Sequence, residues 1–318
     1  MKVGVIGTGN MGENHVRTYL SLHEHCQLVG IFDNDEKKGH QIAEKYKVKQ
    51  FQSMSDLLKS VDAVSIAVPT EFHYDIGLTC IEHNVHMLME KPITSTVAQA
   101  EALLDKALKA DVKVQVGHIE LFNPLIQVLT KELENEDIIG VVFHRMSPYD
   151  ERIKNVDVVK DLMIHDLYIL KALLKDKITE FYALGNIIED TPKHAVAIAR
   201  FSQGVTAQLT ASFKSKRKAR NIQILTEDAF IEVDILNREI KLTRSVLEDK
   251  SNSPVTLTQN IQVDDSIQPL SIELVDFINC IKFEKEPSVS GEDGMRTLMI
   301  TNKISEAISN LKANDDVH

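Results

Sequence analysis

The chain has few cysteines and no long apolar run, and both absences limit what kind of protein it is. Its 318 residues include three cysteines, Cys26, Cys80 and Cys280, without the CxxC spacing of a zinc site or the regularity of a disulfide framework. This usage suits a reducing cytoplasm. No apolar stretch approaches the roughly 20 residues that cross a bilayer, and the N-terminus has no signal-peptide pattern. We expect a cytoplasmic protein without a membrane partner.

Positive charge is also in deficit, with 36 lysines and arginines against 47 acidic residues and a formal net charge of -11. Because phosphate binding needs clustered cations, we expect no nucleic-acid partner. We interpret the single basic run, residues 214–220, as a solvated strand edge, where lysines oppose pairing between sheets. The histidines form no HExxH or comparable cluster, so no metal is expected.

Short apolar stretches alternate with helical patterns through the first third of the chain. Residues 2–6 and 27–33 have strand character, and residues 11–22 between them have the periodicity of an amphipathic helix. Residues 63–68 are almost continuously apolar, as in a strand buried on both faces of a parallel sheet. This alternation predicts a doubly wound α/β Rossmann domain over residues 1–121.

The pattern changes near residue 120. A long helix is expected over 156–174, and a run of strands between 178 and 243 follows with hardly a helix among them. Helices over 270–283 and 294–311 close the chain. The run predicts an α+β domain over 122–318 with a large, mainly antiparallel open sheet, used for substrate binding and oligomerisation. Its terminal helices are free to pack back toward the first domain.

A glycine-rich loop, Gly7-Thr8-Gly9-Asn10-Met11-Gly12, stands between the first strand and the first helix. In a dinucleotide-binding turn, Gly7 permits the tight bend, Gly9 lets the backbone approach a pyrophosphate, and Gly12 lets the helix pack on the strand. The helix N-terminus, at Asn10 and Met11, then offers N–H groups to the anion. We expect this loop to bind a dinucleotide.

An acidic residue, Asp33, ends the second strand about 20 residues after the loop, where a carboxylate accepts hydrogen bonds from the adenosine ribose. Asn34 and Asp35 follow, and no arginine stands ready for a 2′-phosphate. A second negative charge there would repel that phosphate. The cofactor is therefore expected to be NAD(H) rather than NADP(H).

Two further strand ends should line the ligand crevice, because the carboxyl ends of parallel strands face it. At the end of the strand over 63–68 we expect cofactor contacts from Val68, Pro69, Thr70 and His73. At the end of the next strand, Glu90 and Lys91 are expected at the nicotinamide end of the cofactor. Taken alone, Lys91 is equally well interpreted as an ordinary exposed lysine.

A carboxylate and an imidazole, Asp161 and His165, are spaced i and i+4 in the expected long helix and so share a face. A carboxylate one turn away orients an imidazole and raises its basicity, which prepares it to accept a proton. The spacing alone equally fits a helix-surface ion pair. Asp166, next in sequence, is interpreted as a structural partner.

Together these motifs resemble the glucose–fructose oxidoreductase, inositol dehydrogenase and MocA family (Gfo/Idh/MocA) over almost the whole chain. The glycine loop, the acidic strand end, Glu-Lys-Pro at 90–92, Gly-His…Phe-Asn-Pro at 117–124 and the Asp161…His165 pair follow the family's order. The resemblance implies an NAD-dependent dehydrogenase of CH–OH groups in which Lys91 lies beside the substrate hydroxyl. It also implies catalytic roles for Asp161 and His165, and a homodimer or homotetramer joined through the sheets.

Residues 145–166 are similar to one branch of that family. Enzymes of this branch oxidise the 3-hydroxyl of UDP-N-acetylglucosamine to a ketone, which is then the substrate of an aminotransferase. Leu121 departs from this branch, which usually has arginine there, and a lost guanidinium removes a phosphate or carboxylate contact. Candidate substrate contacts are His118, Asn123, Arg152 and Lys154. Their alternative interpretation is that of ordinary polar residues.

Two other functions stay open. One is a dehydrogenase of a free sugar or cyclitol. The other is an NAD(H)-binding sensor or scaffold without catalysis, which would need none of Lys91, Asp161 and His165. The presence of all three favours an enzyme.

Overall fold

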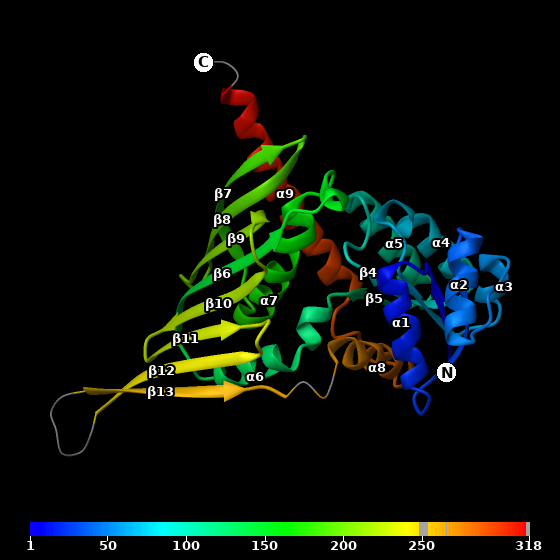
Figure 1. Cartoon of the computed structure of the whole chain (residues 1–318), viewed down its shortest axis with the longest axis horizontal. Helices are drawn as coiled ribbons and strands as arrows, with labels where there is room; N and C mark the ends of the chain where they lie inside the picture. Colours follow the sequence, from blue (N-terminus) through cyan, green and yellow to red (C-terminus); the bar gives the residue numbers. More distant parts are fainter. Residues whose placement is uncertain (248–253, 265, 267, 316–318) are drawn as a thin grey trace. The chain divides into compact units, whose positions relative to one another are not determined.

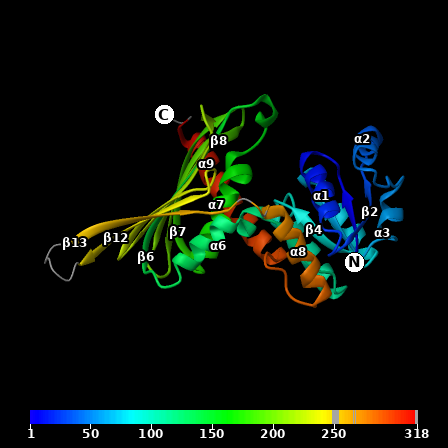
Figure 2. The ribbon, with the colours of Figure 1, turned by 60° about the horizontal axis from the view of Figure 1, so that its bottom comes forward.

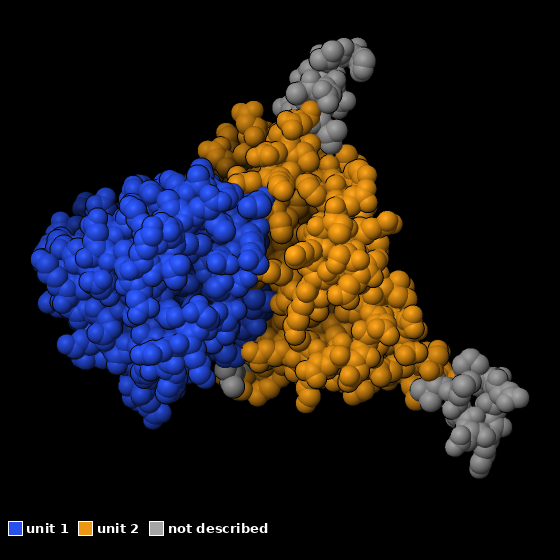
Figure 3. All heavy atoms as spheres, turned by 180° about the vertical axis from the view of Figure 1, so that it is seen from behind, with its two compact units in different colours: residues 1–122, 267–299 blue, residues 123–266, 300–318 orange. Residues whose placement is uncertain are grey.

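The computed structural model describes residues 1–247, 254–264, 266 and 268–315, which fall into two compact units. The first unit comprises residues 1–122 and 267–299, and the second comprises the described parts of 123–266 and 300–318 (Figure 3). Each has its own hydrophobic core. The chain therefore returns to the first unit after the second sheet is complete. Across the described residues, no helix has the length and apolarity needed to traverse a bilayer.

A parallel sheet forms the centre of the first unit (Figure 1). Its strands, in the spatial order β2-β1-β3-β4-β5, are β1 (Lys2–Ile6), β2 (Gln27–Phe32), β3 (Ala63–Ile66), β4 (His86–Glu90) and β5 (Val114–Gly117). Gln50 adds one further parallel bridge to Ile31 on the outer side of β2. The strand order reverses between β1 and β3, and ligands of open α/β sheets bind at such a point.

Helices cover both faces of this sheet. They are α1 (Asn10–Ser21), α2 (Glu36–Tyr46), α3 (Met54–Leu58), α4 (His73–Glu82), α5 (Val97–Lys109), α8 (Pro269–Lys282) and the first part of α9 (Gly291–Asp315), with single 3₁₀ turns η1 (Thr70–Phe72) and η2 (Ile119–Phe122). Val3 and Val5 pack with apolar side chains of α1, α2 and α8. Gly4 faces the opposite way, against Leu57 of α3.

The second unit is built on a mixed sheet with the spatial order β13-β12-β11-β10-β6-β9-β8-β7. Its strands are β6 (Ile138–Pro148), β7 (Ile178–Ile188), β8 (Thr191–Phe201), β9 (Thr206–Ser215), β10 (Ala219–Thr226), β11 (Ala229–Asp234), β12 (Glu239–Leu247) and β13 (Pro254–Gln262). All neighbours pair antiparallel except β6 and β9. The predicted α/β fold with a mainly antiparallel second sheet is confirmed.

One face of this sheet is covered by helices and the other is open (Figure 2). The covering helices are α6 (Pro124–Glu132), α7 (Ile164–Leu174) and the part of α9 after residue 299. The side chains of Leu129, Leu167 and Ile304 lie in one core with Phe143 and Leu209 of the sheet. In β11, buried residues alternate with more accessible ones, as the two-residue period of β-structure requires.

The structure differs from the sequence-based expectation in the middle of the chain. Helix α6 and strands β6 and β13 were not predicted, although β6 is a central strand. The long helix expected over 156–174 is interrupted: a π-helical turn, η4 (Val159–Met163), precedes α7, and a short 3₁₀ turn, η3 (Glu151–Ile153), comes before it.

The interpretation of residues 214–220 as a strand edge was wrong. The run lies at the end of β9 and the start of β10, and each of these strands has a neighbour on both sides. The connection between β9 and β10 crosses the end of β6, because β6 lies between these two strands and pairs with each of them. Which strands are edges depends on pairing between distant segments, so local charge could not reveal it.

Candidate cofactor and active site

Two of the three loop glycines are required by the protein itself. Gly7 has φ +87°, a left-handed conformation that favours glycine, and a Cβ there would lie 2.7 Å from the carbonyl oxygen of Ala67. A Cβ on Gly12 would overlap the carbonyl oxygen of Gly7. The turn and the close packing of α1 on β1 therefore both depend on missing side chains.

Gly9 is different, because the protein leaves space where its side chain would be. No heavy atom of the described structure, apart from its chain neighbours, lies within 4 Å of that Cβ position. Gly9 is the N-cap of α1 and supplies no side-chain cap to the first N–H groups. Open space beside unpaired N–H groups at a helix start fits the phosphates of a dinucleotide.

A pocket of about 590 Å³ lies beside this loop, at the carboxyl ends of β1, β2 and β3. It is lined by Ile6, Gly7, Thr8, Gly9, Phe32, Asp33, Asn34, Lys38, Met54, Ala67, Val68, Pro69, Phe72, Asp75 and Ile76. The predicted cofactor contacts among these residues are Gly7, Gly9, Asp33, Val68 and Pro69. The other predicted contacts do not line the pocket: Asn10, Met11, Gly12, Thr70, His73, Glu90 and Lys91.

The carboxylate of Asp33 is fixed in this pocket by the glycine loop. Its Oδ2 accepts hydrogen bonds from the backbone N–H and the hydroxyl of Thr8, both at 2.6 Å, and its Oδ1 accepts one from the N–H of Asp35 at 2.8 Å. The glycine loop and the acidic strand end are therefore joined by hydrogen bonds. This arrangement is expected of a site that binds the phosphates and the ribose of one ligand.

Sequence reasoning missed the apolar wall of the pocket. Met54 comes from α3, Phe72 from η1 and Ile76 from α4, and the Phe72 side chain is 52% exposed. Such side chains suit a flat adenine ring. Phe72 and Ile76 follow β3, which was the available signal for them, whereas Met54 lies beyond α2 and no local signal marks it. Lys38, which pairs with Asp35 at 3.5 Å, was also missed.

The Glu-Lys-Pro segment follows directly from β4. The Glu90 side chain is 13% exposed, and its Oε1 lies 2.9 Å from Nε2 of the buried His15. His73 is buried, with Nδ1 and Nε2 each 3.0 Å from the carbonyl oxygens of Pro92 and Val68, respectively. Burial lowers the pKa of His73 below its usual value, so the ring is neutral near pH 7. His118, at the end of β5, is buried.

In the second unit, Asp161 lies in the π-helical turn and His165 in the first turn of α7. Single π turns inside helices are frequent at functional sites. Asp166 is buried and paired with the equally buried Arg145 of β6, whose Nε donates to Oδ1 at 2.8 Å. That contact gives Asp166 the structural role expected of it.

The other candidate substrate contacts are less tightly held. The Asn123 side chain caps α6 by accepting a hydrogen bond from the N–H of Leu125 at 3.1 Å. Lys154 is 55% exposed and lies 3.9 Å from Glu189. The side chain of Arg152 falls outside the described residues. In the described part of the chain, no group of three or more metal-ligating side chains is arranged to hold an ion.

Two family models match the two parts of the chain. One, an oxidoreductase family with an NAD-binding Rossmann fold, matches residues 1–118, and the other, the GFO/IDH/MocA C-terminal domain, matches residues 139–232. The chain belongs to the Gfo/Idh/MocA family. The predictions of family, NAD as cofactor and an oxidoreductase are therefore confirmed.

Relatives extend over nearly the full length. UDP-N-acetylglucosamine 3-dehydrogenase of Acidithiobacillus ferrooxidans is 29% identical over 97% of both chains, and a solved structure of that enzyme superimposes with a TM-score of 0.90 over the same shares. Myo-inositol 2-dehydrogenase of Thermotoga maritima is 24% identical over 94% of both chains. A levoglucosan dehydrogenase bound to NADH and levoglucosan shares the fold, with a TM-score of 0.84 and 16% identity over 98% of this chain and 97% of the other.

Proposed function

We propose that this family member oxidises the 3-hydroxyl of UDP-N-acetylglucosamine, or of a related nucleotide sugar, to a ketone with NAD. The observation that carries the proposal is the 29% identity to an enzyme of that activity over 97% of both chains, with a TM-score of 0.90. The second support is that Lys91, Asp161 and His165 stand at the positions of the family's motifs.

The proposed chemistry needs a proton acceptor and a hydride acceptor. Bound NAD accepts the hydride that leaves the sugar carbon. His165, oriented by Asp161, accepts the hydroxyl proton, and Lys91 stabilises the alkoxide as its charge develops. Thr8 and Asp33 hold the ribose end of the pocket, and Gly9 leaves room for the phosphates. The same proposal includes contacts to the sugar or its diphosphate from His118, Asn123, Arg152 and Lys154. It also includes contacts to the cofactor from Thr70, His73, Glu90 and Lys91.

A free sugar or cyclitol is the second candidate substrate. It is favoured by the likeness to an inositol dehydrogenase and by Leu121, which lacks a charge for a diphosphate. Both candidates use the same proton-transfer residues, so they differ only in what binds beyond the reacting hydroxyl.

The deciding experiment follows NADH absorbance with UDP-N-acetylglucosamine, N-acetylglucosamine and myo-inositol as alternative substrates. Parallel assays contain 2-oxoglutarate, because a cofactor reoxidised in place gives no net NADH, and ketone formation is then followed by mass spectrometry. Turnover of the nucleotide sugar alone supports the first proposal. Turnover only of inositol or the free sugar would overturn it in favour of the second.

The Lys91→Ala variant tests whether the chain is an enzyme of this type rather than a sensor. Removal of a group that stabilises the developing alkoxide should lower kcat by roughly 100-fold or more. NADH affinity, measured by fluorescence titration, should change little. Full activity in this variant would refute the role given to Lys91.

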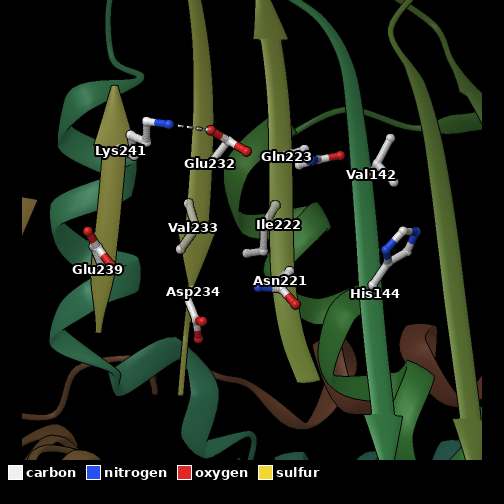
Figure 4. A pocket seen from close by; sticks show the side chains of 10 residues that line it. All are labelled: Val142, His144, Asn221, Ile222, Gln223, Glu232, Val233, Asp234, Glu239 and Lys241. Carbon is white, nitrogen blue, oxygen red and sulfur yellow. Dashed lines mark ion pairs between the residues drawn. The ribbon is translucent and has the colours of Figure 1, made fainter. Parts of the chain in front are cut away.

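We also propose that two copies of the chain pair through the open face of the second sheet, as a homodimer or homotetramer, and that an aminotransferase consumes the ketone. Tyr182 and Ile198, which face each other across β7 and β8, are 68% and 50% exposed on that face. The same face has a shallow pocket of about 420 Å³ that includes His144, Gln223 and the Lys241–Glu232 ion pair at 3.4 Å (Figure 4).

A further inference from the structure

A continuous chain of buried polar side chains runs through the first unit to the segment that carries Lys91. The hydroxyl of Tyr19 on α1 lies 2.8 Å from Oγ of Ser65 on β3. The same Oγ lies 2.9 Å from Nδ1 of His15, and Nε2 of His15 lies 2.9 Å from Oε1 of Glu90. Tyr19, Ser65 and His15 are each at most 1% exposed.

The direction of these hydrogen bonds follows from the acceptor at the end of the chain of side chains. The carboxylate of Glu90 can only accept, so we assign the hydrogen of this contact to Nε2 of His15. Nδ1 of His15 then accepts from the Ser65 hydroxyl, and the Ser65 oxygen accepts from the Tyr19 phenol. Every polar group in the chain thus has a defined partner.

Glu90 is held on its other side as well. It pairs with Gly117 across β4 and β5, and a Cβ on Gly117 would come within 3.1 Å of the Glu90 carboxylate. The absence of a side chain at Gly117 therefore makes room for this carboxylate beside His15. One residue beyond Lys91, the Pro92 carbonyl meets the buried ring of His73. Lys91 stands between two residues that buried histidines anchor.

We propose that His15, acting through Glu90, is a positioning residue for Lys91, with Tyr19 and Ser65 fixing its ring and His73 holding the opposite side of the turn. The inference rests on the role of Lys91 in the proposed function but does not depend on which sugar is oxidised. His15 also lies on α1, the helix that begins at the phosphate loop. The contact between His15 and Glu90 therefore links α1 to the end of β4, which Lys91 directly follows.

The test compares His15→Leu, which leaves Glu90 without its donor, with His15→Gln, whose amide N–H can still reach the carboxylate. Displacement of a catalytic group by about 1 Å costs on the order of 100-fold in rate. We therefore expect kcat to fall by about 10–100-fold in His15→Leu, with partial recovery in His15→Gln and KM for NAD changed much less. Ser65→Ala, a small change that also leaves the ring unanchored, should lower kcat in the same direction.

A second measurement is independent of the substrate. Pulse labelling with an amine-reactive reagent, read by peptide mass spectrometry, gives the reaction rate of each lysine in the folded protein. The labelling rate of the Lys91 amine should change by at least about threefold in His15→Leu, because the neighbouring Glu90 carboxylate is no longer fixed. In His15→Gln the labelling rate should return toward the native value. The rate at Lys59 should stay constant. His83→Leu is the matched control. Both ring nitrogens of native His83 also make hydrogen bonds, but these bonds do not involve Tyr19, Ser65, His15 or Glu90.

The outcomes separate the two proposals. An altered Lys91 rate together with the native enzyme's failure to oxidise UDP-N-acetylglucosamine would overturn the substrate proposal and keep the positioning role. Unchanged Lys91 labelling in His15→Leu and Ser65→Ala would overturn the positioning role, whatever the substrate. Equal losses in His15→Leu and His83→Leu would also overturn it, because the effect would then be a general consequence of removing a hydrogen-bonded histidine from the first unit.

Discussion

At the scale of single residues, the three glycines of the loop between β1 and α1 meet different physical needs. Gly7 and Gly12 are demanded by the backbone that surrounds them, whereas Gly9 faces open space. The sequence spacing predicted all three, but only the coordinates separate the two that shape the fold from the one whose missing side chain leaves room for a ligand.

Gly9→Ala should therefore weaken cofactor binding without unfolding the protein. A methyl group would occupy the space left for the phosphates, and we expect NADH to bind at least about tenfold more weakly, which corresponds to 1.4 kcal/mol. The melting temperature without cofactor should change little, since the methyl meets no protein atom. Gly140→Ala on β6 is the control, because its Cβ would make only an ordinary contact with Thr206. An unchanged NADH affinity in Gly9→Ala would argue against phosphate binding at this loop.

At the scale of elements, helix α8 brings an unusual group into the first unit. Glu273 is fully buried, and neither carboxyl oxygen has a hydrogen-bond partner among the described residues. Burial, and then the charge of Glu90, raise the pKa of Glu273 well above its ordinary value of 4.5. The folded protein therefore holds a proton here that the unfolded chain releases above pH 4.5.

This difference makes stability depend on pH in a known direction. Because the folded pKa is the higher one, the contribution of Glu273 to stability is complete below pH 4.5 and is lost as the pH rises toward the folded value. Glu273→Gln removes this loss, so its melting temperature should exceed that of the native protein by more at pH 8 than at pH 5. A gain of about 1 kcal/mol corresponds to about 2–4 °C. Glu101→Gln, at an exposed position on α5, should show no such trend.

Helix α7, which carries the proposed proton acceptor His165, is anchored by the buried ion pair of Arg145 and Asp166. Asp166→Asn leaves the guanidinium buried without its counter-charge, and loss of one partner of such a pair costs about 3–5 kcal/mol. Urea unfolding followed by circular dichroism should show this loss. Lys154→Gln, which removes one exposed partner of a 3.9 Å contact, should change stability by less than about 1 kcal/mol. Equal stability of the two variants would contradict the structural role of Asp166.

At the scale of the whole molecule, the open sheet face is the surface through which we propose that copies of the chain associate. It combines exposed apolar side chains on β7 and β8 with the polar depression over β6, β10, β11 and β12. Apolar side chains gathered on one face mark an interaction surface. A second copy of the same face offers both an apolar and a polar area in matching positions, as a two-fold interface requires.

A charge placed on this face should therefore disrupt the oligomer. Leu184 is 65% exposed on β7, beside Tyr182 and Ile198, and Leu184→Lys combined with Ile198→Lys would bury two unpaired cations in the interface. Sedimentation velocity should show a smaller species than the native protein. Leu108→Lys, at an 82% exposed position on α5, is the control and should leave the oligomer intact. A native protein that sediments as a monomer would refute the proposed pairing.

The sequence by itself determined the first domain, its glycine-rich loop and the acidic strand end. These depend on local spacing: glycines at a turn, an apolar strand before them and a helix after. It also determined the family and the two groups of catalytic candidates, Lys91 and the Asp161…His165 pair. Tertiary structure decided what depends on segments far apart in the chain. It placed the unpredicted strand β6 between β9 and β10, so that the basic run is no edge, and it returned α8 to the first unit. It also joined His15, Ser65 and Glu90 from three elements into one buried chain of side chains, which no local pattern encodes.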